Sequence, residues 1–117
     1  MQYVLLIYQS EAESTPPSDT AANEMLAEYR GFTNSIKESG NYLGGEALQP
    51  VATATTVRLH GGKRLVIDGP FAETREQLAG FYAIEAADLD EAIEIALRIP
   101  GARYGSIVIR PVWHLGG

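Results

Sequence analysis

The 117-residue chain contains no cysteine, one tryptophan and two histidines. Without cysteine it can form neither disulfides nor thiolate metal sites, and it has no thiol nucleophile. His60 and His114 lie far apart in the sequence and outside any spacing typical of metal ligands, so we expect no metal site. A chain without cysteine fits a reducing compartment, and we expect a cytoplasmic protein.

Positive charge and long apolar runs are also scarce. Nine lysines and arginines stand against 15 acidic residues, which gives a net charge of −6, and the longest basic run is Lys63-Arg64. This charge repels phosphate backbones, so we expect no nucleic-acid partner. The apolar run at 4–7 is too short for a signal sequence or a membrane span, so we expect a soluble protein with no membrane partner.

The remaining composition is that of one ordinary globular domain. Hydrophobic residues make up 45% of the chain and charged residues 21%, and no repeat or linker divides it, so we expect a single domain over 1–117. The glycine pairs at 44–45 and 61–62 match no nucleotide-binding fingerprint, and no serine lies in a Gly-x-Ser-x-Gly elbow. We therefore expect no organic cofactor and no serine-hydrolase chemistry.

Two stretches have the periodicity of amphipathic helices. In the first, over 19–39, Ser18 is a good N-cap and Gly40 can take the left-handed position after the last turn. Its apolar face consists of Ala22, Met25, Leu26, Tyr29, Phe32 or Thr33, and Ile36. The second helix begins after Asp88, which with Glu91 forms a capping-box pattern, and its period continues until Ile99-Pro100-Gly101 stops it.

Strand patterns fill most of the remaining chain. Residues 3–8 predict a central strand buried on both faces, and further strands are expected at 42–48, 80–86 and 105–112, with a bulge at the glycine pair 44–45. Segments 53–59 and 63–68 flank His60-Gly61-Gly62 and predict a hairpin inserted between two strands. Segment 11–19, rich in Ser, Thr, Pro and acidic residues, predicts the most mobile loop.

This order of elements predicts an α+β, ferredoxin-like βαββαβ domain with an inserted hairpin. Its two helices cover one face of the sheet, yet the strands are apolar on both faces. A bare apolar face is unusual on a monomer, so we expect a homodimer in which two sheets pack together as a dimeric α+β barrel, burying about 800 Å² per subunit. The alternative is that the hairpin folds back over its own sheet.

Three blocks of sequence resemble one known family. They are Asp-Gly-Pro-Phe-Ala-Glu-Thr-Arg-Glu-Gln-Leu-Ala-Gly-Phe-Tyr at 68–82, Gly-Gly-Glu-Ala-Leu-Gln-Pro at 44–50 and Pro-Gly-Ala-Arg-Tyr-Gly at 100–105. In order and spacing they are similar to the YCII-related (DGPF domain) family. The resemblance implies a dimeric α+β barrel but no defined reaction, since the family is largely uncharacterised. Some members are associated with extracytoplasmic-function sigma factors.

In other YCII-related proteins a His and Asp pair in a cleft has suggested an enzymatic role. Asp68 matches the family aspartate, but the helix at 19–39 contains no histidine, and Tyr29 stands near the position where one is expected. A mechanism that depends on histidine therefore does not carry over to this chain.

The candidate catalytic residues are Asp68, Glu46 and Tyr29, and the candidate ligand-binding residues are Phe71 and Phe81. Asp68 is either a general base or the acceptor of a turn, and Glu46 is either a site residue or a solvated edge-strand residue. Tyr29, Phe71 and Phe81 either line a pocket or fill the core. We expect Asp68, Glu46 and Tyr29 to converge on one cleft between the first helix and the sheet, near the dimer interface.

Three functions fit these features. The first is a cofactor-independent small-molecule enzyme with an Asp-centred acid/base cleft, and the second is a non-catalytic small-ligand binder or sensor. The third is a protein-interaction partner in sigma-factor-linked regulation, as the resemblance suggests. A pocket holding Asp68 with a raised pKa favours the enzyme, a pocket without titratable groups favours the sensor, and the lack of a pocket favours the interaction partner.

Overall fold

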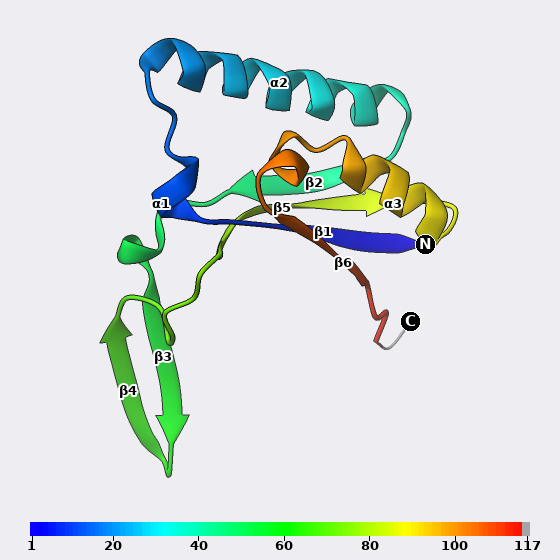
Figure 1. Ribbon diagram of the computed structural model, residues 1–117. Coiled ribbons are helices and arrows are strands. Elements are labelled where there is room, and N and C mark those ends of the chain that lie inside the picture. The colour runs from blue at the N-terminus through cyan, green and yellow to red at the C-terminus, as the bar shows by residue number, and fades with distance from the viewer. Residues whose placement is uncertain (116–117) are drawn as a thin grey trace.

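Four antiparallel strands form the central sheet of the computed structural model, which describes residues 1–115 (Figure 1). Strands β1 (Gln2–Gln9), β2 (Tyr42–Ala47), β5 (Gln77–Glu85) and β6 (Ser106–Pro111) lie in the order β2-β5-β1-β6. Helix α2 (Asp19–Glu38) connects β1 to β2, and helix α3 (Leu89–Leu97) connects β5 to β6. This topology confirms the predicted α+β class and the ferredoxin-like order of elements.

Helix α2 begins at its expected residue and ends one residue before its expected end, and α3 begins directly after Asp88 as expected, because local capping sets these ends. The Ser18 hydroxyl accepts the backbone N–H of Ala21 at 3.1 Å, and Gly40 follows α2 with a φ of 79°. At α3, Asp88 Oδ1 accepts the N–H of Glu91 at 2.9 Å. The reciprocal bond of the expected capping box runs to the Ala87 N–H instead of the Asp88 N–H, at 3.3 Å from Glu91 Oε1.

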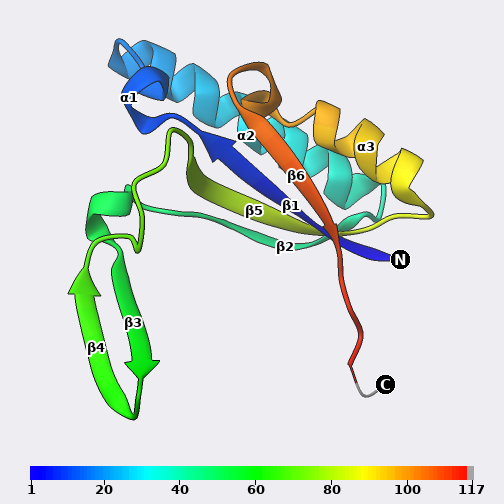
Figure 2. The same cartoon turned by 60° about the horizontal axis from the view of Figure 1, so that its bottom comes forward.

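The core lies between the helices and one face of the sheet. Tyr3, Leu5 and Ile7 of β1 are buried there with Ile84 of β5 and Ile36 of α2. The expectation that β1 is buried on both faces is wrong for the single chain, because alternate residues such as Val4 and Leu6 are only half-buried. Both helices pack on the same side, which leaves the second face uncovered (Figure 2).

We call this second surface the open face. Strand pairing places Leu6 beside Phe81 and Val108, and Phe81 beside Glu46, so these side chains share it. Val4, Tyr8, Ala83 and Arg110 belong to the same face by the same pairing. It is largely apolar, with Glu46 on the edge strand β2, Arg110 on the opposite edge strand β6, and the paired Gln2 and Glu85 at one end.

Helix α2 packs on the sheet along only its C-terminal half. Phe32 and Ile36 are buried, whereas Met25 and Tyr29 are half-buried and Leu26 is 57% exposed. The predicted apolar face of the helix is therefore longer than the surface it covers. The space beneath its N-terminal half is the candidate site described below.

A hairpin of β3 (Thr55–His60) and β4 (Lys63–Asp68) forms a separate two-stranded sheet between β2 and β5 in the chain. Its two-residue turn is made by Gly61 and Gly62, whose φ angles of 57° and 78° suit glycine. In Figures 1 and 2 the hairpin projects from the body on the side away from the helices. It does not cover its own sheet, so the alternative to the dimer is not realised in the single chain.

The segment expected to be a mobile loop is partly ordered. Its first residues form a short helix, α1 (Glu11–Ser14), capped by the Ser10 hydroxyl. The Glu11 N–H donates to Gln77 Oε1 at 2.9 Å, and Glu11 Oε2 accepts the N–H of Val51 at 3.0 Å. These partners are distant in sequence, so local composition gave no sign of them.

Two 3₁₀ turns complete the elements, η1 (Val51–Thr53) before the hairpin and η2 (Pro100–Arg103) after α3. Within residues 1–115, no helix has the length and apolar character required to cross a membrane.

Candidate functional site

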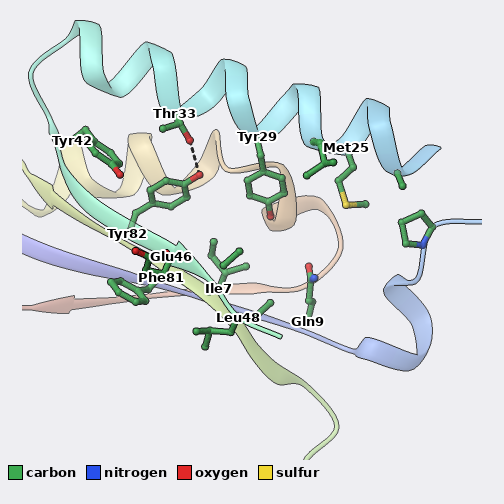
Figure 3. A pocket seen from close by; sticks show the side chains of 17 residues that line it. Ile7, Gln9, Met25, Tyr29, Thr33, Tyr42, Glu46, Leu48, Phe81 and Tyr82 are labelled. Atoms are coloured by element: carbon green, nitrogen blue, oxygen red, sulfur yellow. Dashed lines mark hydrogen bonds between the residues drawn. The ribbon is translucent and has the colours of Figure 1, made fainter. Parts of the chain in front are cut away.

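A cavity of about 640 Å³ lies beneath the N-terminal half of α2, between that helix and the β2 edge of the sheet. This volume is within the range of small-molecule sites, about 300 to 1,000 Å³. Most of its wall is apolar, and its polar groups come from Gln9, Tyr29, Thr33, Tyr42 and Tyr82 (Figure 3). The apolar wall includes Ile7, Pro16, Ala22, Met25, Leu26, Ala47, Leu48 and Ala79.

Tyr29 projects from α2 toward the sheet and stands near the middle of the cavity, between Thr33 and Met25 of the same helix (Figure 3). Its hydroxyl meets the backbone of η2 so closely that a Cβ at Gly101 would lie 2.7 Å from the phenolic oxygen. The same Cβ would lie 3.2 Å from Cγ2 of Ile7, so only glycine at 101 lets the tyrosine ring reach this position. Burial raises the pKa of Tyr29, and the nearby N–H of Gly101 lowers it by less.

Tyr82 supplies the second hydroxyl from the sheet side. Its oxygen lies 2.8 Å from Thr33 Oγ1 of α2, in a hydrogen bond that either group can donate. The ring is held edge-on by Phe32 and by Tyr42, at centroid distances of 5.1 and 6.4 Å. Burial raises the pKa of Tyr82 as well, against the lowering effect of the Thr33 hydrogen bond.

These groups define what the cavity can do chemically. Both phenols are neutral at physiological pH, as tyrosines ordinarily are, and burial moves their pKa values further from it, so both can donate hydrogen bonds. The Gln9 amide adds both a donor and an acceptor. The cavity therefore suits a small, mainly apolar molecule whose oxygen atoms accept hydrogen bonds.

Glu46 and Phe81 border the cavity, but their side chains lie on the other face of the sheet. They are paired neighbours on β2 and β5, and Phe81 is also paired with Leu6, which belongs to the open face. Figure 3 shows both side chains on the side of the strands opposite Tyr29 and Tyr82. They therefore contribute to the cavity wall through their strands, and the Glu46 side chain does not point toward Tyr29.

Asp68 and Phe71 are not among the residues that line the cavity. Asp68 is exposed at the end of β4, paired with Thr55, and Phe71 is 74% exposed. The expected convergence of Asp68, Glu46 and Tyr29 does not occur within one chain, because the hairpin carries Asp68 away from the sheet. Of the three, Tyr29 is the one whose side chain faces the cavity.

Gln9, Thr33 and Tyr82 were missed at the sequence level, although each carries a polar group of the cavity. The alternation of β5 places Tyr82 on the same side of the sheet as Ile84, and the spacing of Tyr29, Thr33 and Ile36 places Thr33 on the inner face of α2. The same alternation places Gln9 on the inner side of β1, after Leu5 and Ile7, although it lies at the last residue of the strand.

A second hollow of about 260 Å³ lies next to the first and shares Gln9, Pro16, Met25 and Tyr29 with it. Its outer wall carries an ion pair between Arg103 and Glu28, and the guanidinium of Arg103 lies 5.4 Å from the ring centroid of Tyr104. Across residues 1–115, no three His, Asp or Glu side chains lie close enough together to hold a metal ion.

Comparison with known proteins identifies relatives of the chain. The model of the YCII-related domain family matches residues 1–115. An uncharacterized protein of Rhizobium meliloti (strain 1021) is 35% identical over 114 residues, which cover 96% of this chain and 92% of the relative. Among solved structures, the 5-chloro-2-hydroxyhydroquinone dehydrochlorinase TftG of Burkholderia phenoliruptrix AC1100, in complex with 2,5-dihydroxybenzoquinone, aligns with a TM-score of 0.53. That alignment covers 97% of this chain and 95% of TftG at 13% identity, so it shows a shared fold.

Proposed function

Because the chain belongs to the YCII-related domain family, a membership that defines no reaction, we propose a function from its own cavity. The protein binds a small, mainly apolar molecule with hydrogen-bonding oxygen atoms, such as a hydroxylated aromatic compound. The observation that carries this proposal is the 640 Å³ cavity, whose apolar wall is interrupted by the hydroxyls of Tyr29 and Tyr82. The ligand in the complex of the fold neighbour TftG, 2,5-dihydroxybenzoquinone, is also a small ring compound with oxygen substituents.

Thermal shift with 2,5-dihydroxybenzoquinone and a panel of substituted phenols tests this proposal. A ligand at 100 times its Kd adds about 2.7 kcal/mol to the free energy of unfolding. The variant Tyr29→Phe loses one hydrogen bond of about 1 kcal/mol, so it should bind roughly fivefold more weakly than the wild type. The matched control Tyr104→Phe changes a tyrosine outside the cavity wall and should bind like the wild type. Equal affinity of Tyr29→Phe and the wild type, or no shift across the panel, would contradict the proposal.

Catalysis on the same ligand, without a cofactor, is the second candidate. The fold shared with a dehydrochlorinase favours it, although 13% identity carries no residue roles. Tyr29 is the ionisable group best placed at the ligand, and its protonated hydroxyl can donate a hydrogen bond at neutral pH. The originally expected acid/base pair of Asp68 and Glu46 lacks geometric support within one chain.

We also propose that the chain is a homodimer joined through the open face. The half-exposed side chains of Val4, Leu6 and Phe81 and the 39% exposed Val108 form an apolar surface of the kind that monomers rarely leave in water. We place the two-fold axis along the strands, which brings the Glu46 edge of one sheet near the Arg110 edge of the other, so that opposite charges face each other. This arrangement is the dimeric α+β barrel that the family resemblance implies.

Light scattering at micromolar concentration measures the mass of the particle in solution and therefore tests the dimer directly. The wild type should have about twice the chain mass of 12.7 kDa. Val108→Glu places a charge on the open face and should shift the protein to the monomer mass. Leu97→Glu, a matched change at a 66% exposed position on α3, should leave the mass unchanged. A wild-type mass of 12.7 kDa would refute the dimer.

A further inference from the structure

Nothing in residues 1–115 of the single chain covers the apolar side chains of the hairpin β3–β4. Val57, Leu59 and Val66 are 69%, 78% and 48% exposed, so the hairpin keeps bulky apolar side chains in water. Isolated two-stranded hairpins are at best marginally stable in water, and exposed apolar strands are prone to pair or aggregate. The hairpin therefore requires a surface to pack on.

The register of the hairpin places three of its five bulky apolar side chains, Val57, Leu59 and Val66, on one face. Val57 is paired with Val66, and Leu59 with Arg64, so these side chains share a face that we call the apolar arm face. The other face carries Arg58, His60, Lys63, Leu65 and Ile67. The apolar arm face also holds Thr55 and Asp68 at the root of the hairpin, so it is apolar only along its middle, whereas the other face is mainly basic toward the tip.

The root of the hairpin is fixed to the body, so the hairpin has a defined direction. Glu11 accepts the N–H of Val51 at 3.0 Å, and the Leu48 N–H donates to the Ala79 carbonyl at 2.8 Å. Across the root, the Gly69 N–H donates to Ala54 O at 2.7 Å. The Thr56 hydroxyl donates to Gly69 O at 2.8 Å.

The hairpin points toward the side of the open face. Both views show it beyond the sheet on the side away from α2 and α3, and the chain after β6 extends to the same side (Figures 1 and 2). The radius of gyration is 16.3 Å, compared with about 13 Å for a compact domain of this length. A second copy seated on the open face would therefore lie in the space beside the hairpin.

The charge of the hairpin also fits a second copy of this chain. Thr55–His60 and Lys63–Asp68 with their turn carry Arg58, Lys63 and Arg64 against Asp68 alone, a net charge of +2. Since the whole chain carries −6, the remainder carries −8. A basic arm on an acidic body is complementary to another copy of that body, which favours association.

We infer that the hairpin is an exchanged arm, whose apolar face of Val57, Leu59 and Val66 packs against the body of a second copy of this chain. The inference rests on the dimer proposed above and adds a second contact to its open-face interface. Because a two-fold interface is self-complementary, each chain gives one arm and receives one. In this dimer the apolar arm face is buried. The radius of gyration of the single chain is large because its arm extends toward the second copy.

Sedimentation equilibrium of two matched variants tests the arm. Leu59→Asp changes the apolar arm face, and Leu65→Asp makes the same chemical change on the opposite face of the same hairpin. Leu59→Asp should raise the dimer dissociation constant at least tenfold, and Leu65→Asp should change it by less than about threefold. Circular dichroism should show that both variants fold, since neither position contributes to the core.

Limited trypsin digestion gives a second measurement on the unaltered hairpin, which contains Arg58, Lys63 and Arg64. Above the dissociation constant these sites should be cut at least tenfold more slowly in the wild type than in the Val108→Glu variant. Equal cleavage rates would overturn the inference.

The outcomes separate the arm from the dimer. If Val108→Glu gives monomers and Leu59→Asp stays dimeric, the open-face dimer stands and the arm is refuted. If the wild type is monomeric, the dimer and the exchanged arm are both refuted. Ligand binding in the cavity is tested by a separate measurement and does not depend on this result. A third outcome is that the wild type binds a duplex oligonucleotide, Lys63→Glu abolishes this binding, and Leu59→Asp leaves the mass of the dimer unchanged. The hairpin would then be a nucleic-acid-binding element, and the inference would be overturned.

Discussion

At the scale of single residues, the site depends on two partly buried tyrosines whose hydroxyls can donate hydrogen bonds. Tyr29 and Tyr82 both have raised pKa values, mainly because burial disfavours the phenolate. In the unfolded chain a tyrosine ionises near its ordinary pKa of about 10. The folded protein therefore holds these protons to a higher pH than the unfolded chain does.

This difference predicts a loss of stability at alkaline pH. Below about pH 10 the phenols are protonated in both states, so their contribution to the free energy of unfolding is constant and fully present. As the pH rises above about 10, the unfolded state loses protons first and stability falls. Urea denaturation from about pH 9 to pH 11 should show a shallower decline for Tyr29→Phe than for the wild type. Parallel declines would contradict the assignment of a raised pKa to Tyr29.

The residues of the site could be predicted only where the signal is local. Tyr29 was identified because it interrupts an apolar helical face with a polar group. Asp68 and Glu46 were grouped with it because the elements that carry them are adjacent in sequence, but the side a strand residue faces depends on register. Glu46 was placed on the wrong side of the sheet for this reason, and Asp68 was assigned to the cleft although it lies on the projecting hairpin.

At the scale of elements, helix ends were predictable because their determinants lie within a few residues. Ser18 and Asp88 cap the two helices as expected. Helix α1 was not predicted, because its Glu11 is held by Gln77 and Val51, far away in sequence. The sequence also does not predict how much of α2 packs on the sheet, because periodicity shows that a helix has an apolar face but not what that face contacts.

Removal of the α3 cap gives an element-scale prediction. Asp88→Ala leaves the Glu91 N–H without its 2.9 Å acceptor and should lower the free energy of unfolding by about 1 kcal/mol, or several degrees in Tm. Asp90→Ala is the matched control, because it removes the same charge from the first turn but no capping bond. Equal effects of the two substitutions in thermal melts would show that charge near the helix terminus, and not the cap, stabilises α3.

At the scale of the whole molecule, the incomplete covering of the sheet by helices explains both the cavity and the open face. The sheet is covered by helices on one side only, and even there α2 covers it along half its length. The first gap is the open face, which we assign to a second copy of the chain, and the second is the cavity, which we assign to a ligand. The sequence indicates the open face, because its strands are apolar on both sides. The cavity could not be predicted from the sequence and is visible only in the structure.

The central claim, that the cavity beneath α2 binds a small oxygen-bearing molecule, is tested most directly by NMR. Amide ¹H–¹⁵N spectra of the dimer, titrated with 2,5-dihydroxybenzoquinone and phenol, report which residues meet the ligand. The account predicts saturable shifts at Tyr29, Thr33, Gly45 and Tyr82, all of which line the cavity. Shifts confined to the hairpin or the open face, or no saturable shifts at millimolar concentrations of either compound, would contradict it.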